Sequence, residues 1–224
     1  MMNDLSIKAV IFDFGGVFTT SPVEKFNAYE QTHGLANNFI GGVIKSRLHD
    51  GAFSRFERGE ISPEEFDTQF AAETKAAGHE VSGAQFLNFL KLDAKPEMIE
   101  VLRDVKQAGF QTGCITNNFP KTSNKKDPAH DNYQTLFDNT KALFDHIIES
   151  SAVGVRKPEP RIYEMMCEAL NVEARHCIFL DDLGVNLKPA QTMGMTTIKV
   201  PFGDVSPAIN TLCELTGLER SKGI

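Results

Sequence analysis

The feature that most constrains this chain is a series of five short strand-like segments that alternate with segments of helical spacing. The strand-like segments cover residues 9–12, 110–116, 145–148, 177–180 and 196–200. Residues 9–12 are apolar without a break, which is typical of a strand buried on both faces. Short strands that alternate with helices form a parallel sheet with helices on its faces. The sequence therefore predicts an α/β fold.

A long helical block, residues 22–92, interrupts this alternation after the first strand-like segment. Apolar residues recur in the block at helical spacing, and no strand-like segment divides it. Ser62 and Glu65 predict a helix start, with Ser62 as N-cap and Glu65 closing a capping box. An all-helical insert after a first strand is typical of a cap domain. We expect a core of residues 1–19 and 94–224, with a cap of residues 20–93.

Composition narrows the class of protein. The net charge of −7 argues against nucleic acid or an anionic membrane as partner, but a phosphate substrate is compatible with it because attraction at a site is local. The four cysteines lack CxxC spacing, which indicates free thiols in a reducing compartment. No signal-peptide pattern or membrane-length apolar run is found. We expect a soluble, cytoplasmic monomer or homodimer that acts on a small molecule.

Polar residues follow the ends of the strand-like segments. They are Asp13, Gly15 and Gly16, then Thr116 and Asn117, then Lys157 ahead of a helix, and finally Asp181, Asp182 and Asn186. Taken separately, each of these groups of residues has an ordinary explanation. It could be a turn, a lysine in an exposed loop or the cap of a helix. In a parallel sheet, however, the carboxyl ends of the strands meet at the edge where ligands bind. The sequence therefore predicts one site at this edge.

The residue types in this set suit phosphoryl transfer. Carboxylates from two strands can hold Mg²⁺, which prefers few carboxylates together with carbonyl oxygens and water. Thr116 and nearby amides can donate to an anionic group. Lys157 supplies a positive charge that stabilises a phosphoryl group and keeps Asp13 ionised. A carboxylate can also serve as a covalent nucleophile, a known route for phosphoryl transfer.

Four segments resemble the motifs of the haloacid dehalogenase superfamily of hydrolases. FDFGGV is similar to the first motif, ITNN to the second, VGVRKPEPRIY to the third and FLDDLGVNLKPAQTMGM to the fourth. The last two segments are also similar to the N-terminal phosphatase-like domain of soluble epoxide hydrolase. The resemblance implies a Rossmann-like core with helices on both faces, an inserted all-helical cap and a magnesium-dependent hydrolase, most often a phosphatase.

The resemblance assigns the nucleophile and the metal ligands. Asp13 would attack phosphorus and form an aspartyl-phosphate. The carboxylates of Asp13 and Asp182, with the carbonyl oxygen of Gly15, would bind Mg²⁺. Asp181 would orient the catalytic lysine or a metal-bound water. Asn186 would support the metal site without binding the ion.

The resemblance also assigns the groups that hold the substrate. Thr116 and the amide of Asn117 would bind the phosphoryl oxygens. Lys157 would neutralise their charge, and the turn at Gly15 and Gly16 would complete the binding loop.

Gly15 departs from the pattern of the family's phosphatases, which usually carry a second Asp at this position. That Asp protonates the leaving oxygen and later activates water, and such acid–base catalysis contributes about 10² to 10⁴ in rate. One explanation is a phosphatase whose acid–base group comes from the substrate or the cap, where His33, His49 and Glu57 are candidates. A second is a dehalogenase, because a halide needs no proton to leave. A third is a slow enzyme or a binding module.

The paired acids at 181 and 182 distinguish these explanations. The family's dehalogenases lack a metal site, whereas Asp181 and Asp182 suit Mg²⁺. We therefore expect hydrolysis of a small organic phosphate. Substrate choice is expected to lie with the cap, whose residues facing Asp13 the sequence alone does not identify.

Overall fold

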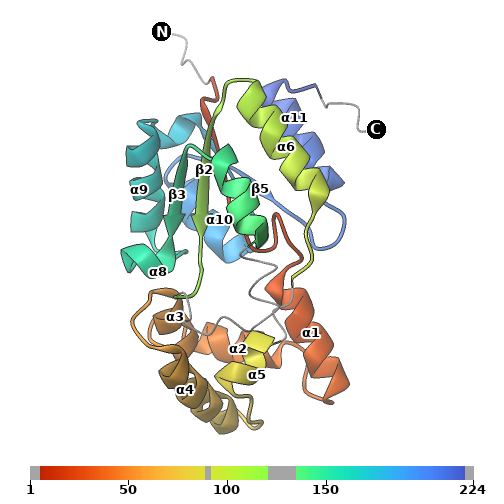
Figure 1. Cartoon of the computed structure of the whole chain (residues 1–224), viewed down its shortest axis with the longest axis vertical. Helices are drawn as coiled ribbons and strands as arrows, with labels where there is room; N and C mark the ends of the chain where they lie inside the picture. The colour runs from red at the N-terminus through yellow and green to blue at the C-terminus, as the bar shows by residue number, and fades with distance from the viewer. Residues whose placement is uncertain (1–5, 89–91, 121–134, 220–224) are drawn as a thin grey trace.

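A five-stranded parallel sheet forms the centre of the computed structural model, which describes residues 6–88, 92–120 and 135–219. The strand order is β3-β2-β1-β4-β5, and every neighbouring pair is parallel. The strands are β1 (Ala9–Phe12), β2 (Gln111–Thr116), β3 (His146–Glu149), β4 (Cys177–Asp181) and β5 (Thr196–Lys199) (Figure 1). This arrangement confirms the predicted α/β fold.

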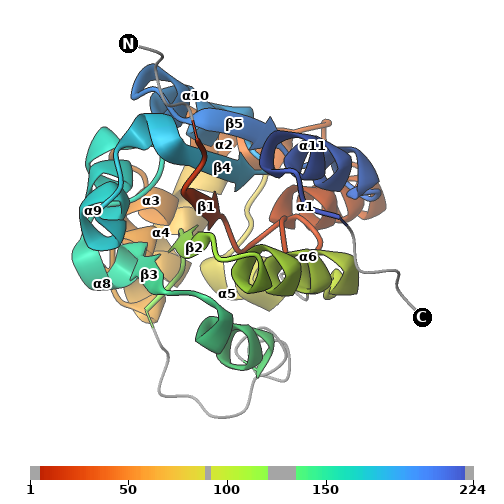
Figure 2. The ribbon, with the colours of Figure 1, turned by 90° about the horizontal axis from the view of Figure 1, so that it is seen from above.

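Helices cover both faces of the sheet, as Figure 2 shows. On one face lie α6 (Pro96–Gln107) and α11 (Ser206–Thr216), and on the other lie α9 (Pro160–Leu170) and α10 (Gly184–Thr192). Side chains of β1 alternate between the two layers: Val10 belongs to the first apolar cluster and Ile11 to the second. Burial on both faces explains the unbroken apolar run of this strand.

In the described residues between β1 and α6, five helices form a separate helical layer. They are α1 (Pro22–Thr32), α2 (Phe39–Ser46), α3 (Ala52–Glu57), α4 (Pro63–Ala76) and α5 (Gly83–Asn88). Figure 1 shows them together at the end of the sheet toward which β2 points. They enclose an apolar cluster of their own, rich in phenylalanine, which includes Phe56, Phe66 and Phe86. We call these helices the cap.

The capping box predicted for the fourth of these helices is present. Ser62 Oγ accepts a hydrogen bond from the amide of Glu65 at 3.1 Å, and Glu65 Oε2 accepts one from the amide of Ser62 at 2.7 Å. Two backbone donors at the start of α4 are thereby satisfied, which fixes where the helix begins.

The two connections between cap and core lie side by side. Thr19 and Ala94 form an antiparallel bridge, and the amide of Thr20 donates to the carbonyl of Asp93 at 2.8 Å. Domain boundaries at residues 19/20 and 93/94 remain a prediction.

The remaining elements are short. They are α8 (Ser150–Val153) and the 3₁₀ turns η1 (Lys141–Leu143) and η2 (Ala174–His176). The polar composition of residues 119–142 predicts an extended surface loop followed by a short helix near residues 136–144. The part from 121 to 134 lies outside the described residues, and residues 135–140 are helical, in agreement with the predicted short helix. None of the four cysteines forms a disulfide. Within the described ranges, every helix is too short or too polar to cross a membrane.

Candidate active site

Strand register brings two of the predicted acids to adjacent positions. Phe12 at the end of β1 pairs with Leu180 of β4, and the amide of Asp13 donates to the carbonyl of Leu180 at 2.8 Å. The next residues along the two strands are therefore Asp13 and Asp181. Both carboxylates are buried, with residue exposures of 7% and 0%.

Lys157 bridges these two acids. Its Nζ lies 2.7 Å from Asp13 Oδ1 and 2.8 Å from Asp181 Oδ2. The lysine reaches them from the segment between α8 and α9 and is fully buried. The ammonium also lies 5.7 Å from the centroid of the Phe179 ring, within the range of a cation–π contact. The exposed-loop alternative for Lys157 is thereby excluded.

Asp182 adds a third carboxylate. One oxygen from each of Asp13, Asp181 and Asp182 lies within 4.8 Å of the other two. The Ser21 hydroxyl donates to Asp182 Oδ2 at 2.5 Å. Close approach of Asp182 requires glycine at position 16, because a Cβ there would lie 2.3 Å from Asp182 Cγ and the backbone has a φ of +82°.

The charges of this cluster are not balanced. Three ionised carboxylates and one lysine carry a formal charge of −2. Burial raises the pKa of Asp13 well above its usual range, and the neighbouring acids Asp181 and Asp182 act in the same direction, whereas Lys157 opposes them. Burial, followed by the charge of Asp181, raises the pKa of Asp182 to about 6. A buried, all-oxygen site with two excess negative charges fits a divalent cation such as Mg²⁺.

A second set of contacts holds Asp181 in place. Asn186 Nδ2 donates to both carboxylate oxygens of Asp181 at 3.1 Å, and the amide of Leu183 donates to Oδ1 at 2.8 Å. The Tyr163 hydroxyl in turn donates to the carbonyl of Asn186 at 2.7 Å. The oxygens of Asp181 are thus engaged by Lys157, Asn186 and Leu183, and its role in orienting the lysine stays a prediction.

Thr116 and Asn117 lie at the end of β2, next to β1 in the sheet. Asn117 Oδ1 accepts from the amide of Lys157 at 2.9 Å, and its Nδ2 donates to the carbonyl of Lys157 at 3.0 Å. The side chain of Asn117 therefore fixes the backbone that carries the lysine. Its backbone amide is the group predicted to bind phosphoryl oxygen, and that role stays a prediction.

The cap residues proposed as proton donors have different surroundings. His33 and His49 are both exposed. The ring of His33 stacks on Tyr29 with centroids 3.9 Å apart. Glu57 is buried instead, and its Oε2 lies 2.5 Å from Nη2 of Arg156. Glu57 also accepts a hydrogen bond from Nδ2 of Asn117, a predicted site residue, at 3.4 Å.

Three polar residues near the site, Ser21, Lys95 and Arg156, were not predicted from the sequence. Lys95 Nζ donates to the carbonyl of Gly16 at 3.0 Å. Lys95 is only 7% exposed, and burial lowers its pKa. Ser21 precedes Pro22 and Lys95 precedes Pro96, so each carried only the signal of a helix start.

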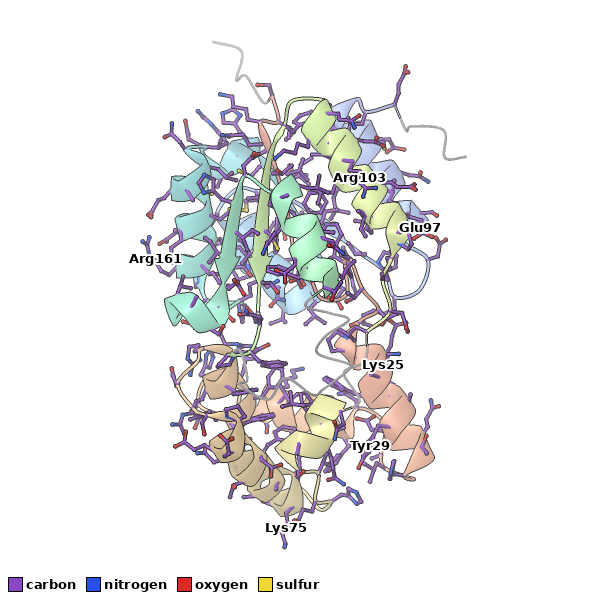
Figure 3. The ribbon with its side chains drawn as sticks, viewed as in Figure 1. Lys25, Tyr29, Lys75, Glu97, Arg103 and Arg161 are labelled. Atoms are coloured by element: carbon purple, nitrogen blue, oxygen red, sulfur yellow. The ribbon has the colours of Figure 1, made fainter. Side chains whose placement is uncertain are left out.

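Lys157→Met is expected to lower the free energy of unfolding by about 3–5 kcal/mol, because it leaves two buried carboxylates without their cation. Urea unfolding in EDTA measures the change. Lys75→Met is the control, since Lys75 is exposed, pairs with Glu80 and lies at the end of α4 away from the sheet (Figure 3). A Lys157 variant as stable as this control would show that Lys157 does not compensate the buried charges of Asp13 and Asp181.

The chain is similar in sequence to several named proteins. The chain is 33% identical to mouse acyl-CoA dehydrogenase family member 10 over 98% of its own length and 20% of the relative's. It is 27% identical to mouse bifunctional epoxide hydrolase 2, over 96% of its own length and 40% of that protein's, which confirms the resemblance to epoxide hydrolase. The chain thus spans a fifth to two-fifths of these relatives. It is also 30% identical to the sesquiterpene phosphatase astK of Aspergillus oryzae, over 85% of this chain and 88% of that protein.

Solved structures share the fold. A haloacid dehalogenase family enzyme from Bacteroides thetaiotaomicron, in complex with magnesium and inorganic phosphate, superposes with a TM-score of 0.58 at 21% identity, covering 89% of this chain and 96% of that one. The L-2-haloacid dehalogenase of Xanthobacter autotrophicus gives 0.57 at 20% identity, covering 97% and 90%. Residues 7–194 match the family model of the haloacid dehalogenase-like hydrolases. The chain belongs to this family of hydrolases.

Proposed function

We propose that the protein hydrolyses a small organic phosphate with the help of Mg²⁺, through an aspartyl-phosphate on Asp13. The observation that carries this proposal is the buried cluster in which Lys157 bridges Asp13 and Asp181 while Asp182 lies within 4.8 Å of both acids. The cluster offers a nucleophile, a fixed cation and an excess charge of −2. The nucleophile and the cation suit phosphoryl transfer to a carboxylate, and the excess negative charge suits a divalent cation that would neutralise it.

Hydrogen bonding to Asp13 leaves one oxygen available for attack. Oδ1 receives Lys157 Nζ at 2.7 Å and the amide of Phe14 at 2.6 Å. Within the described part of the chain, Oδ2 accepts no hydrogen bond. In the first step, Asp13 Oδ2 forms a bond to phosphorus and the bond from phosphorus to the ester oxygen breaks.

The carboxylates of Asp13 and Asp182 would hold Mg²⁺, with the carbonyl oxygen of Gly15. When bound, the ion would neutralise charge on the transferring phosphoryl group and the attacking acid. Lys157 adds its fixed charge beside Asp13, and the hydroxyl of Thr116 and the amide of Asn117 donate to phosphoryl oxygens.

The leaving oxygen must gain a proton, and water must lose one in the second step. There, water attacks phosphorus of the aspartyl-phosphate, inorganic phosphate leaves and the Asp13 carboxylate is restored. Gly15 provides no side chain for either transfer. We therefore expect slow turnover for esters with poor leaving groups and faster turnover for esters whose leaving group departs as an anion, such as p-nitrophenyl phosphate.

Dehalogenation of a 2-haloacid is the second candidate function, and Gly15 favours it because a halide leaves unprotonated. The acid pair at positions 181 and 182 argues the other way, since displacement of a halide by a carboxylate requires no cation. Phosphatase relatives, including the sesquiterpene phosphatase of Aspergillus oryzae, also support phosphate hydrolysis.

Metal removal separates the candidates. The test measures phosphate release from p-nitrophenyl phosphate and chloride release from 2-chloropropionate, each with Mg²⁺ or with EDTA. We expect phosphate release that stops in EDTA and returns with added Mg²⁺, and no chloride release. Chloride release unaffected by EDTA would favour the dehalogenase. No turnover of either compound class across a wider panel would favour a binding module.

A further inference from the structure

We propose that Glu57 of the cap is a positioning residue: through Arg156 and Asn117 it fixes the segment that carries Lys157 beside Asp13. This inference rests on the proposed function, because it concerns the rate of the step in which Lys157 and the Asn117 amide hold the phosphoryl group.

Glu57 ends α3 and forms a buried ion pair with Arg156 of the core. Oε2 lies 2.6 Å from Nε and 2.5 Å from Nη2 of the arginine. The residues are 5% and 6% exposed. Arg156 precedes Lys157 directly in the chain, so the ion pair holds the residue adjacent to the lysine. Charged groups this deeply buried persist only when they are paired.

Asn117 connects the same carboxylate to the lysine backbone. Its Nδ2 lies 3.4 Å from Glu57 Oε2 and 3.0 Å from the carbonyl of Lys157, while its Oδ1 accepts the amide of Lys157 at 2.9 Å. Glu57 thus contacts both residues that set the backbone position of Lys157.

The position of Glu57 depends on how the cap meets the core. The Ser150 hydroxyl at the start of α8 donates to the carbonyl of Glu57 at 2.6 Å. Gly59 approaches the backbone of Ser151 so closely that a Cβ would lie 2.7 Å from its carbonyl oxygen. Phe119, just beyond Asn117, stacks on Phe56 of the cap with centroids 5.0 Å apart. The cap therefore supplies Glu57 to the site only when α3 lies against α8 and the end of β2.

Positioning differs from proton donation in a measurable way. Burial raises the pKa of the Glu57 carboxyl above its usual range, whereas Arg156, which binds the carboxylate through two nitrogens, opposes this shift. The two roles are therefore separated by the leaving group. A general acid would matter most for leaving groups that need a proton, whereas a positioning residue affects all leaving groups alike.

The test uses Glu57→Gln in the full chain with Mg²⁺, assayed on p-nitrophenyl phosphate and on an alkyl phosphate. We expect kcat to fall about tenfold or more on both substrates, because small displacements of catalytic groups cost up to about 10²-fold, while KM stays within about threefold. The matched control is Glu60→Gln, since Glu60 pairs with Arg58 on the same cap segment at the surface. A defect confined to the alkyl phosphate would overturn positioning in favour of proton donation, and an unchanged kcat would also overturn it.

A second variant separates positioning from general stability. Glu57→Gln leaves Arg156 buried without its partner, whereas the double variant Glu57→Gln/Arg156→Gln removes the stranded charge. We expect the double variant to regain the melting temperature of the wild type but not its kcat. Recovery of both would show that the ion pair is merely structural and would overturn the proposal.

Amide hydrogen exchange tests the same contact without turnover. We expect exchange of the Lys157 amide, which is bonded to Asn117, to rise about tenfold in Glu57→Gln and to stay unchanged in Glu60→Gln. Unchanged exchange in Glu57→Gln would overturn the inference. If the wild type hydrolyses no phosphate but this exchange response occurs, the proposed function fails and the structural coupling stands.

Discussion

Asp13→Asn is expected to lower turnover of p-nitrophenyl phosphate by roughly 10⁴-fold or more, the scale of loss when a covalent nucleophile is removed. The amide replaces a charged nucleophile with a neutral group, while its size stays the same. It also removes one of the two carboxylates bound by Lys157. Initial rates at saturating substrate measure the loss, and ¹⁹F NMR of the protein with beryllium fluoride measures whether the phosphate mimic still binds the acid.

Asp50→Asn serves as the control, because Asp50 is an exposed acid that pairs with Arg47 on the cap. It should retain both turnover and beryllium fluoride binding. If Asp13→Asn still binds the mimic, the nucleophile is a different residue. If turnover survives while binding of the mimic is lost, the reaction does not pass through Asp13.

Gly15→Asp is expected to raise kcat on alkyl phosphates by about 10² to 10⁴-fold, because it restores a general acid–base group two residues after the nucleophile. The local structure accepts a side chain here: a Cβ on Gly15 would meet no atom within 4 Å, and its φ lies outside the left-handed region. The gain should be small for p-nitrophenyl phosphate, whose leaving group departs without a proton. The dependence of kcat on leaving-group pKa measures the difference.

Gly15→Ala is the matched control, since it adds the Cβ without the carboxyl group. It should leave kcat unchanged on both types of ester. If Gly15→Asp gives no gain on alkyl phosphates, the wild-type protein already obtains its proton from another source. A gain as large on p-nitrophenyl phosphate would indicate that the new acid acts on something other than the leaving group.

Features that depend on neighbours along the chain were predicted from the sequence. Strand β1 was predicted with its observed bounds, because burial on both faces leaves a pattern in four consecutive residues. The capping box at Ser62 was equally local. Strand β4 runs one residue further than predicted, to Asp181, because pairing of Asp181 with Lys199 of β5 extends the strand into the polar acid.

The sequence by itself determined the α/β class, the helical insert and the set of polar residues at the strand ends, because periodicity, caps and turns depend on neighbours along the chain. Only the tertiary structure decided that Lys157 bridges Asp13 and Asp181, that Ser21 binds Asp182 and that Glu57 pairs with Arg156. Partners in these contacts are up to 161 residues apart in the chain. Such contacts form only when the sheet, the cap and the two connections between them pack together, and a buried charge then pairs with whichever opposite charge the fold brings within reach.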